Sequence, residues 1–566
     1  MDCGRRISGR RAPASAINNM DRGSTSWCDF FVATADASAI SIMEKMRFIK
    51  QYRASLLFWI GLTLLYFLTH LPGLTQLPVF SDEAIYIRWA QLIISDWQQY
   101  LFFPLNDGKT PLFIWMLVPF LKVVCDPLLG GRLLSVLGGF IQMIVIIQIL
   151  KQLKVNRIGQ FVGALIVVLA PFWFTHHRMV LMDGWLTVWI SVAVLSVLKI
   201  AVTNTRRKII WIGLGAASVW AGLMTKIPFV LALPSLVVLP LKDHHSVRRL
   251  WSTSIPIWSA LFLGSLLFLT LAASPVFPQL FSRGGDFLMP VEEVISGRWI
   301  ETIPSIQTYI GYFFNYAGWG VFVLAAIGVW LSRNRRATAV LLSCFVLFSL
   351  PIWVLGRVVY PRYLFPAMLF LTLAAAMGAG SLWQWSLEKI HTSARQFAIR
   401  LLLFLLLTQL LVSSTTFIVP SLFFPNSTPF VSADQGQYLT TWSSGHGLVE
   451  VYDYLQQLDQ QQTIGTIRVA TEGSFGSLPD GLLLYNFRQP LARVWIEGIG
   501  YPVDRIPESF FLKIEPEDIV LLVVNSDRLL WNLDPKYLLR EYCRPDGRTC
   551  LQVWNITTEV KNHLAD

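Results

Sequence analysis

Long apolar runs recur along this chain and limit what it can fold into. A helix needs about 20 mostly apolar residues to cross the hydrocarbon layer of a membrane. Eleven runs approach that length: 54–71, 131–150, 159–175, 180–200, 209–225, 227–241, 252–273, 313–331, 337–355, 363–381 and 397–419. Charged residues make up 14% of the chain, against about 25% in soluble domains. This excludes a soluble enzyme, a disordered protein and a disulfide scaffold, and it predicts an all-α polytopic membrane protein.

One short run decides the orientation. Pro111 to Cys125 is apolar but is broken by Pro111 and Pro119. If it does not cross, five basic clusters share one side with Lys45 to Arg53, and basic loops are typical of the cytoplasmic side. The clusters are Lys151/Lys154/Arg157, Arg206/Arg207/Lys208, Lys242/Arg248/Arg249, Arg333/Arg335/Arg336 and Lys389/Arg395/Arg400. We therefore predict a juxtamembrane or re-entrant 111–125, a cytoplasmic N-terminus and an outer C-terminal region. The clusters also explain much of the net charge of +11, which then does not indicate a nucleic-acid partner.

Three regions follow from this pattern. Residues 1–44 lack an apolar run long enough for a signal sequence and are predicted to be a disordered tail or an extension upstream of the true start. Residues 45–420 form the transmembrane domain. Residues 421–566 begin with a polar, Gly/Ser-rich linker and are predicted to form a small extracytoplasmic α/β domain.

The C-terminal region carries the periodicity of a mixed domain. Residues 447–461 have the pattern of an amphipathic helix, and four segments read as strands: 466–473, 492–498, 518–525 and 550–557. Cys543 and Cys550 lie in this outer, oxidising region and are predicted to form a disulfide. A structural lid and an acceptor-recognition domain both remain open for this region.

Ionisable residues converge on the predicted outer face, whereas the span centres are almost free of charge. Asp82 and Glu83 follow the first span, in SDEAIYIRWAQLIISDW, whose apolar spacing predicts an amphipathic helix on the membrane. Ser81 or Asp82 as a helix cap, with Glu83 favouring the positive helix end, is one interpretation. A general base beside a second acid or metal ligand is the other.

Several cations also lie on this outer face, where the positive-inside tendency works against them. Lys109, Arg132, Arg178, Lys226 and Arg362 are these residues, and together they indicate a phosphate or pyrophosphate ligand. For some of them a structural role competes with binding.

For Lys109 the competing role is a snorkelling lysine, and for Arg178 it is pairing with Asp183 across a helix turn. His176 and His177 are either interfacial histidines or metal ligands with Glu83, although no spacing motif supports a metal.

Six segments in order give the chain a family resemblance. They are SDEAIY (81–86), GKTPLFIWML (108–117), GGRLLSVL (130–137), HHRMVLMDGWL (176–186), AGLMTKIPFV (221–230) and PRYLFPAM (361–368). From about residue 54 to 420 the chain resembles glycosyltransferase family 39 of the GT-C membrane enzymes, which includes protein O-mannosyltransferases and aminoarabinose transferases. Lys-Thr-Pro and Thr-Lys-Ile-Pro replace the family's more common Lys-Pro-Pro and Thr-Lys-Gly-Pro, but both lysines remain.

The resemblance implies a GT-C fold and a sugar donor linked through phosphate to a polyprenyl chain. Asp82 would match the catalytic base, which deprotonates an acceptor hydroxyl for inverting attack. Lys109 and Arg362 would match donor phosphate-binding positions, with Arg178 and Lys226 as weaker candidates. Glu83 would orient the acceptor or help hold a divalent metal ion, to which the resemblance does not commit. Arg132, Asp183 and Tyr363 are candidates for acceptor contacts or structural roles.

The resulting hypothesis is an integral glycosyltransferase of the cell membrane that acts on an extracytoplasmic lipid, glycan or protein. A Rossmann nucleotide fingerprint is absent from the sequence, consistent with a lipid-linked donor. A lipid-linked sugar transporter or flippase is the alternative, disfavoured because transporters place ionisable groups near the bilayer midplane. A catalytically silent scaffold of the cell envelope is a third hypothesis.

Overall fold

The computed structural model of this chain describes residues 56–203, 205–242, 247–388 and 393–565. The N-terminal tail 1–44 and the basic flank Lys45 to Arg53 lie outside these residues, so their predictions are not tested. The chain divides into two compact units, Met1–Leu64 and Leu65–Asp566. The described part of the first unit is helical, and the account below concerns the second unit.

Seven described helices of the chain are long and apolar enough to cross a membrane. Their segments are Pro127–Gln152 (α5), Met182–Val202 (α8), Arg206–Thr225 (in α9, Thr205–Thr225), Ser254–Ala273 (in α11, Val247–Phe268, and its continuation), Arg335–Leu355 (α16), Pro361–Leu387 (mostly α18, Met368–Glu388) and Ser393–Phe423 (α19). Each coincides with a predicted span, and the predicted fold of a polytopic helical membrane protein with a small C-terminal α/β domain is confirmed.

The other four predicted spans are shorter or interrupted helices. Leu56–His70 and α6 (Arg157–Leu169) are short, and Ile227–Lys242 is broken into 3₁₀, α and 3₁₀ turns. Prolines 228, 234 and 240 explain the breaks, because proline removes a helical N–H donor. The fourth comprises α14 (Ile303–Ala317) and α15 (Trp319–Leu331), which belong to a pair bent by 98°. The bend falls at Gly318, whose φ of +79° favours glycine. The total of eleven spans therefore stays a prediction.

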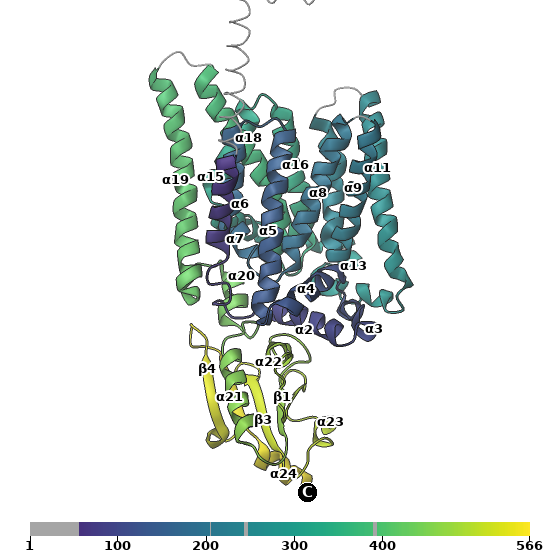
Figure 1. Cartoon of the computed structure of the whole chain (residues 1–566), viewed down its shortest axis with the longest axis vertical. Coiled ribbons are helices and arrows are strands. Elements are labelled where there is room, and N and C mark those ends of the chain that lie inside the picture. Colours follow the sequence, from purple (N-terminus) through teal and green to yellow (C-terminus); the bar gives the residue numbers. More distant parts are fainter. Residues whose placement is uncertain (1–55, 204, 243–246, 389–392, 566) are drawn as a thin grey trace, which may run out of the picture. The chain divides into compact units, whose positions relative to one another are not determined.

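The short run 111–125 forms a helix that cannot cross a membrane. This helix, α4 (Leu112–Val123), has 12 residues, about 18 Å of length against roughly 30 Å of hydrocarbon. It lies with α2 (Ser81–Ser95) and α3 (Trp97–Tyr100) at the end of the bundle that faces the sheet domain (Figure 1). The apolar side of α2 is buried in a core shared with α4 and the C-terminal domain. The predicted helix is confirmed, but its apolar side contacts protein.

The C-terminal domain contains one five-stranded sheet in the order β2-β1-β3-β5-β4. Strands β1 (Ile467–Thr471), β2 (Val494–Gly498) and β3 (Ile519–Asn525) are parallel, whereas β5 (Cys550–Asn555) is antiparallel to β3 and to β4 (Leu538–Cys543). Helices α21 (Leu448–Gln461), α22 (Asp480–Asn486), α23 (Glu508–Phe511) and α24 (Thr557–Ala565) complete the domain.

Most of these C-terminal elements match the predictions. The helix at 447–461, the four strands and the Cys543–Cys550 disulfide are confirmed. Strand β4 was not predicted, because its sequence LLREYC interrupts the apolar pattern with two charges. As an edge strand it is largely exposed, and charged residues are common on such strands.

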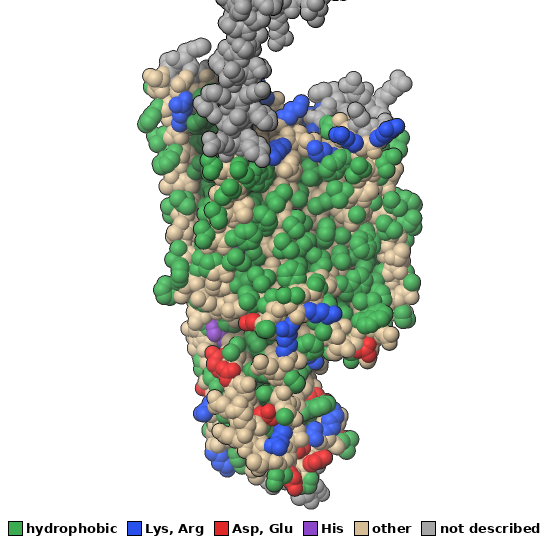
Figure 2. Space-filling view, in the orientation of Figure 1, with side chains coloured by type: hydrophobic (Ala, Val, Ile, Leu, Met, Phe, Trp, Pro, Cys, Tyr) green, Lys and Arg blue, Asp and Glu red, His purple; other side chains and the backbone are tan. Residues whose placement is uncertain are grey.

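Charge is distributed unevenly over the transmembrane bundle. Figure 2 shows Lys and Arg side chains at the end of the bundle away from the sheet domain, separated from that domain by a broad band of hydrophobic side chains. Basic residues flank the helix connections at this end, for example Lys151 and Arg157 between α5 and α6, and Arg335 at the start of α16. This is the arrangement expected of a membrane protein whose basic loops share one side.

Candidate active site

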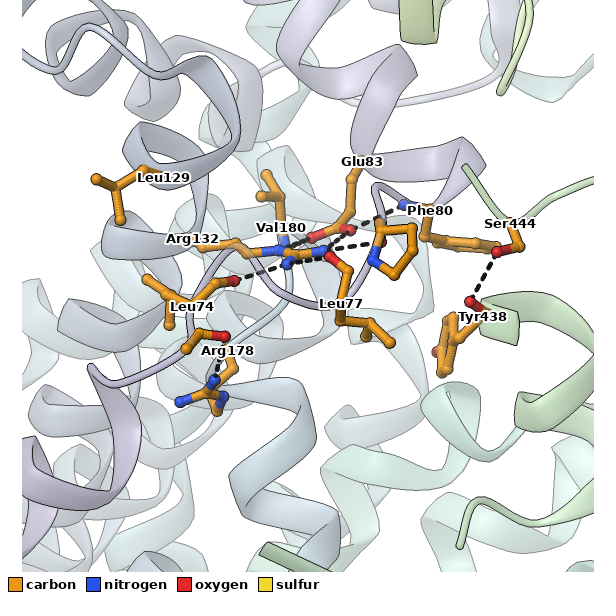
Figure 3. A network of polar contacts seen from close by, with 12 residues as sticks. Leu74, Leu77, Phe80, Glu83, Leu129, Arg132, Arg178, Val180, Tyr438 and Ser444 are labelled. Atoms are coloured by element: carbon orange, nitrogen blue, oxygen red, sulfur yellow. Dashed lines mark hydrogen bonds and ion pairs between the residues drawn. The ribbon is translucent and has the colours of Figure 1, made fainter. Parts of the chain in front are cut away.

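The N-terminus of α2 is held by a buried carboxylate, Glu83. Its oxygens accept hydrogen bonds from Arg132 Nε at 2.9 Å and Arg132 Nη2 at 2.6 Å, and from the backbone N–H groups of Phe80 at 3.0 Å and Val180 at 2.8 Å. The Glu83 side chain is fully buried, and Figure 3 shows it enclosed by these partners. The helix cap is Phe80 and not Ser81 or Asp82.

Arg132 connects Glu83 to the chain that precedes α2. Its Nη1 donates to the carbonyls of Leu74 and Leu77, and its Nη2 also donates to the carbonyl of Pro78. Together with the two bonds to Glu83, these contacts match the five N–H groups of the guanidinium. Both side chains are therefore saturated and buried, and neither presents a free group to a metal ion or an acceptor.

Asp82, the next residue along, faces a different environment. Successive residues of a helix are about 100° apart, so Asp82 and Glu83 point in different directions. The Asp82 side chain is 27% exposed and lies 3.1 Å from Arg362 Nη2. Arg362 in turn donates from Nη1 to Gln437 Oε1 at 2.8 Å. The site thus joins the start of α2, the short helix α17 (Pro361–Leu364) and the segment that precedes the sheet domain.

Aromatic rings surround the Arg362 guanidinium. It lies 5.0 Å from the ring centre of Phe80, 5.1 Å from Tyr360 and 5.3 Å from Tyr363. The faces of such rings attract cations, so they stabilise the charge of a side chain that is only 7% exposed. The guanidinium is therefore held in place next to Asp82.

Two lysines complete the cluster of cations. Lys226 Nζ lies 2.7 Å from Asp183 Oδ1 and 5.0 Å from the Tyr363 ring centre. Lys109 Nζ lies 5.3 Å from the ring centre of Phe287, which is itself 6.3 Å from the ring of Tyr363. Six residues singled out from the sequence therefore meet here: Asp82, Lys109, Asp183, Lys226, Arg362 and Tyr363.

Lys109 differs from the other two cations in its partners. Arg362 is paired with Asp82 and Lys226 with Asp183, whereas Lys109 forms no ion pair or hydrogen bond with any described side chain. Burial lowers the pKa of Lys109, while Asp82 and Asp107 act in the opposite direction. An anionic ligand would restore the favourable environment that burial removes.

The remaining predicted residues lie elsewhere. Arg178 does not pair with Asp183, and its guanidinium donates to backbone carbonyls. His176 is fully buried; its ring stacks on Phe365 at 4.4 Å and its Nδ1 donates to the Phe172 carbonyl at 2.8 Å. Burial lowers the pKa of His176 to about 4, so this residue is neutral at physiological pH.

The candidate metal ligands do not converge. Among the described residues, the one group of three or more His, Cys, Asp and Glu side chains with closely spaced ligand atoms is Glu541, Cys543 and Cys550. Its two cysteines form the disulfide, so this group does not fit a metal ion. Glu83, His176 and His177 do not form such a group in the described part of the chain.

Three residues of the site had no signal in the sequence: Gln437, Phe287 and Asp434. Gln437 lies on a π-helical turn, Gly436–Thr440, that follows α20 (Ser432–Gln435). Only the fold brings it to Arg362, which is 75 residues away in the chain. Phe287 belongs to the connection 274–312, in which the sequence has no motif.

Asp434 is a buried acid in the same segment as Gln437. Its Oδ2 accepts a hydrogen bond of 2.6 Å from the Tyr316 hydroxyl, and its Oδ1 has no hydrogen-bond partner among the described residues. Burial raises the pKa of Asp434 to about 7, against the opposing effects of Tyr316 and Arg362. The charge of this carboxyl group therefore changes near neutral pH, and Arg362 of the Asp82–Arg362 pair is near enough to affect it electrostatically.

Comparison with known proteins relates one part of this chain to a family. The sequence model of the family "Dolichyl-phosphate-mannose-protein mannosyltransferase" matches residues 108–278, which contain Lys109, Arg132, Arg178, Asp183 and Lys226. No curated protein sequence matches the chain. The match supports the predicted resemblance to family 39 in this part of the chain.

Solved structures with a similar fold include ArnT from Cupriavidus metallidurans. Its structure bound to undecaprenyl phosphate is 14% identical with a TM-score of 0.53, and the match covers 88% of this chain and 97% of ArnT. The apo structure of ArnT is 14% identical with a TM-score of 0.51, and the match covers 89% of this chain and 98% of ArnT. A structure of the arabinofuranosyltransferase AftD from Mycobacteria is 16% identical with a TM-score of 0.46, covering 87% of this chain and 36% of AftD. At these identities, the likeness to ArnT shows a common fold.

The role of Glu83 is tested by Glu83→Gln, which removes its charge but keeps its shape. Removing one partner of a buried ion pair typically costs about 3–5 kcal/mol, so we expect a large loss of stability, measured by thermal unfolding in detergent. The exposed Glu292→Gln is the matched control and should leave the unfolding temperature unchanged. Equal stability of the two variants would contradict a structural role for Glu83.

The titration of Asp434 is tested by Asp434→Asn. Because the folded-state pKa lies above the ordinary value of about 4, the folded protein binds more protons than the unfolded chain between pH 4 and 7. The stability that protonation provides is therefore lost as the pH rises through about 7. We expect the unfolding temperature of the unmodified protein to fall by several degrees, relative to the variant, between pH 5 and pH 8. Parallel pH profiles would contradict this assignment.

Proposed function

We propose that this protein transfers a sugar from a polyprenyl-phosphate donor to a hydroxyl group of an extracytoplasmic acceptor. Asp82 acts as the general base of this reaction. It removes the proton from the acceptor hydroxyl, whose oxygen then attacks the anomeric carbon of the sugar. The bond from that carbon to the phosphate oxygen breaks, the configuration inverts, and polyprenyl phosphate leaves with its negative charge.

The position of Asp82 among three cations carries this proposal. A general base must be reachable by substrate, and Asp82 is 27% exposed whereas Glu83 is fully buried. Cations are needed where charge develops on a leaving phosphate, and Arg362, Lys109 and Lys226 lie around the Tyr363 and Phe287 rings beside Asp82. The fold likeness to ArnT, whose structure was solved with undecaprenyl phosphate, supports a donor of this chemical type.

The cations have different tasks in this scheme. Lys109 has no acidic partner among the described residues and is the first ligand of the donor phosphate. Arg362 contacts Asp82, so it is shared between the base and the phosphate and draws donor and acceptor together. Lys226 is neutralised by Asp183 and supports Tyr363. Glu83 is left out of the catalytic set, because its lone pairs already accept from Arg132 and two backbone amides.

The site faces outward in the proposed topology. The basic end of the bundle is cytoplasmic by the positive-inside rule, and the opposite end carries α2, α4 and the sheet domain (Figures 1 and 2). The donor chain then lies in the membrane while its phosphate and sugar reach Asp82. The N-terminus is cytoplasmic, and the acceptor reaches the site from the side of the sheet domain.

The base assignment is tested by Asp82→Asn, with the exposed Asp453→Asn as control. General bases contribute about 10²- to 10⁴-fold to rate, so we expect at least a 100-fold loss of sugar transfer per folded protein. Because Asp82 also pairs with the buried Arg362, thermal unfolding is measured alongside to give the folded fraction of each variant. The assay supplies polyprenyl-phosphate donors to membranes that contain the protein and measures released polyprenyl phosphate and glycosylated product by mass spectrometry. Intact transfer by Asp82→Asn would refute the assignment, and movement of intact donor without release would favour a flippase.

Donor binding is tested separately by Lys109→Met. Removal of an unpaired cation from the phosphate site should raise the KM for the donor at least tenfold and change kcat less, because the base is retained. Lys122→Met, at an exposed position of α4, controls for loss of a lysine at this end of the bundle. An unchanged KM for Lys109→Met would exclude Lys109 as a phosphate ligand.

A further inference from the structure

A second buried arginine lies close to the Arg132–Glu83 pair and has no acidic partner in the described part of the chain. Arg178 follows α7 (Pro171–His176), and its side chain appears beside Arg132 in Figure 3. Its Nη1 donates to the carbonyls of Thr69 at 3.3 Å and His70 at 2.7 Å, and its Nη2 donates to the carbonyl of Gly73 at 3.0 Å. It forms no ion pair with any described carboxylate.

The buried positive charge of Arg178 destabilises the folded state, whereas that of Arg132 is neutralised by an acidic partner. Arg132 is neutralised by Glu83, whereas Arg178 is 8% exposed and, among the described residues, contacts carbonyl dipoles and the Phe174 ring at 4.8 Å. Burial and the nearby charge of Arg132 lower the pKa of Arg178 to about 9, so it is still protonated at neutral pH. A buried cation without an anion is unfavourable. An anion bound next to Arg178 would therefore stabilise the folded protein.

A cavity opens next to this guanidinium. Its volume is about 30 Å³, and its lining includes Arg132, Arg178, Thr175, Thr428 and Ser421. The hydroxyls of Thr175 and Thr428 are buried, and neither has a hydrogen-bond partner among the described residues. Arg178 and two threonines whose hydroxyl groups lack a hydrogen-bond partner among the described residues therefore line one small cavity.

The capacity of the cavity matches a small oxyanion. One buried water needs about 10–15 Å³ measured in this way, so the cavity has room for about two waters or one tetrahedral oxyanion. Three of the five N–H groups of Arg178 donate to carbonyls, which leaves two for a ligand. Two donors of a guanidinium and two hydroxyls are the partners that a phosphate group requires.

We propose that the cavity between Arg178, Thr175 and Thr428 binds a phosphate group, supplied by free inorganic phosphate or by a lipid headgroup. This site is separate from the donor site at Asp82 and does not depend on the proposed reaction. It joins three parts of the chain: the turn after α7, the segment after α19, and the loop at Leu74 that Arg132 also holds. A bound phosphate would neutralise Arg178 and hold these parts together at the outer end of the bundle.

Ligand-dependent stability of the full-length protein in detergent tests this proposal. The unfolding temperature is measured against inorganic phosphate at constant ionic strength, and in parallel in nanodiscs of phosphatidylcholine with and without phosphatidic acid. A ligand that binds only the folded state raises this temperature with concentration. We expect stabilisation in at least one of the two measurements. Stabilisation by inorganic phosphate alone identifies free phosphate as the source, and stabilisation by phosphatidic acid alone identifies a lipid headgroup. No stabilisation in either arm would overturn the proposal.

The variants locate the site. Thr175→Val/Thr428→Val keeps every charge and nearly the same shape, and should weaken the apparent phosphate affinity at least tenfold. Arg178→Lys should weaken it similarly, and if that variant does not fold, the double valine variant still decides. The exposed Thr415→Val should behave as the unmodified protein. Lys109→Met should keep the stabilisation, because the donor site is a different one. Stabilisation that survives the double variant, or that Lys109→Met abolishes, would overturn the proposal.

Discussion

The buried ion pair between Glu83 and Arg132 is the contact on which the arrangement of the site depends. One carboxylate caps the start of α2, holds the backbone of Val180 and neutralises an arginine that fixes the loop at residues 74–78. Ion pairs of this kind stabilise little relative to apolar packing, but they enforce one geometry. Here they fix the direction of α2, and with it the direction in which Asp82 points.

The structure separates the roles of two neighbouring carboxylates that the sequence alone cannot distinguish, Asp82 and Glu83. Glu83 has no exposed surface and every lone pair in use, whereas Asp82 is partly exposed and contacts a cation that other groups can share. The cations divide in the same way. Arg132 is structural, Lys226 is paired, Lys109 is unpaired among the described groups, and Arg178 belongs to a different cavity. The ion pairs of these cations, more than their position at one end of the bundle, therefore separate their roles.

Much of the fold could be predicted from the sequence, because an apolar run of about 20 residues is typical of a membrane-spanning helix. The side on which the basic clusters fall predicted that 111–125 does not cross, and short apolar segments between turn residues predicted four of the five strands. Strand β4 was not predicted since an edge strand tolerates charges such as Arg540 and Glu541. Within the site, motifs gave Asp82, Lys109 and Arg362. Gln437 and Phe287 could not be found because the fold alone brings them to their partners, and no local pattern marks a residue that acts across 75 positions.

The contact between Arg362 and Gln437 also means that the candidate site can form only late in the synthesis of the chain. Asp82 lies near the start of the described chain, Arg362 comes after most of the bundle, and Gln437 emerges only after the last long apolar helix. A chain still under synthesis therefore contains Asp82 and Arg362 before Gln437 is available, and the cluster is complete only when the segment after α19 has been made. The candidate site therefore assembles only after α19 has been synthesised.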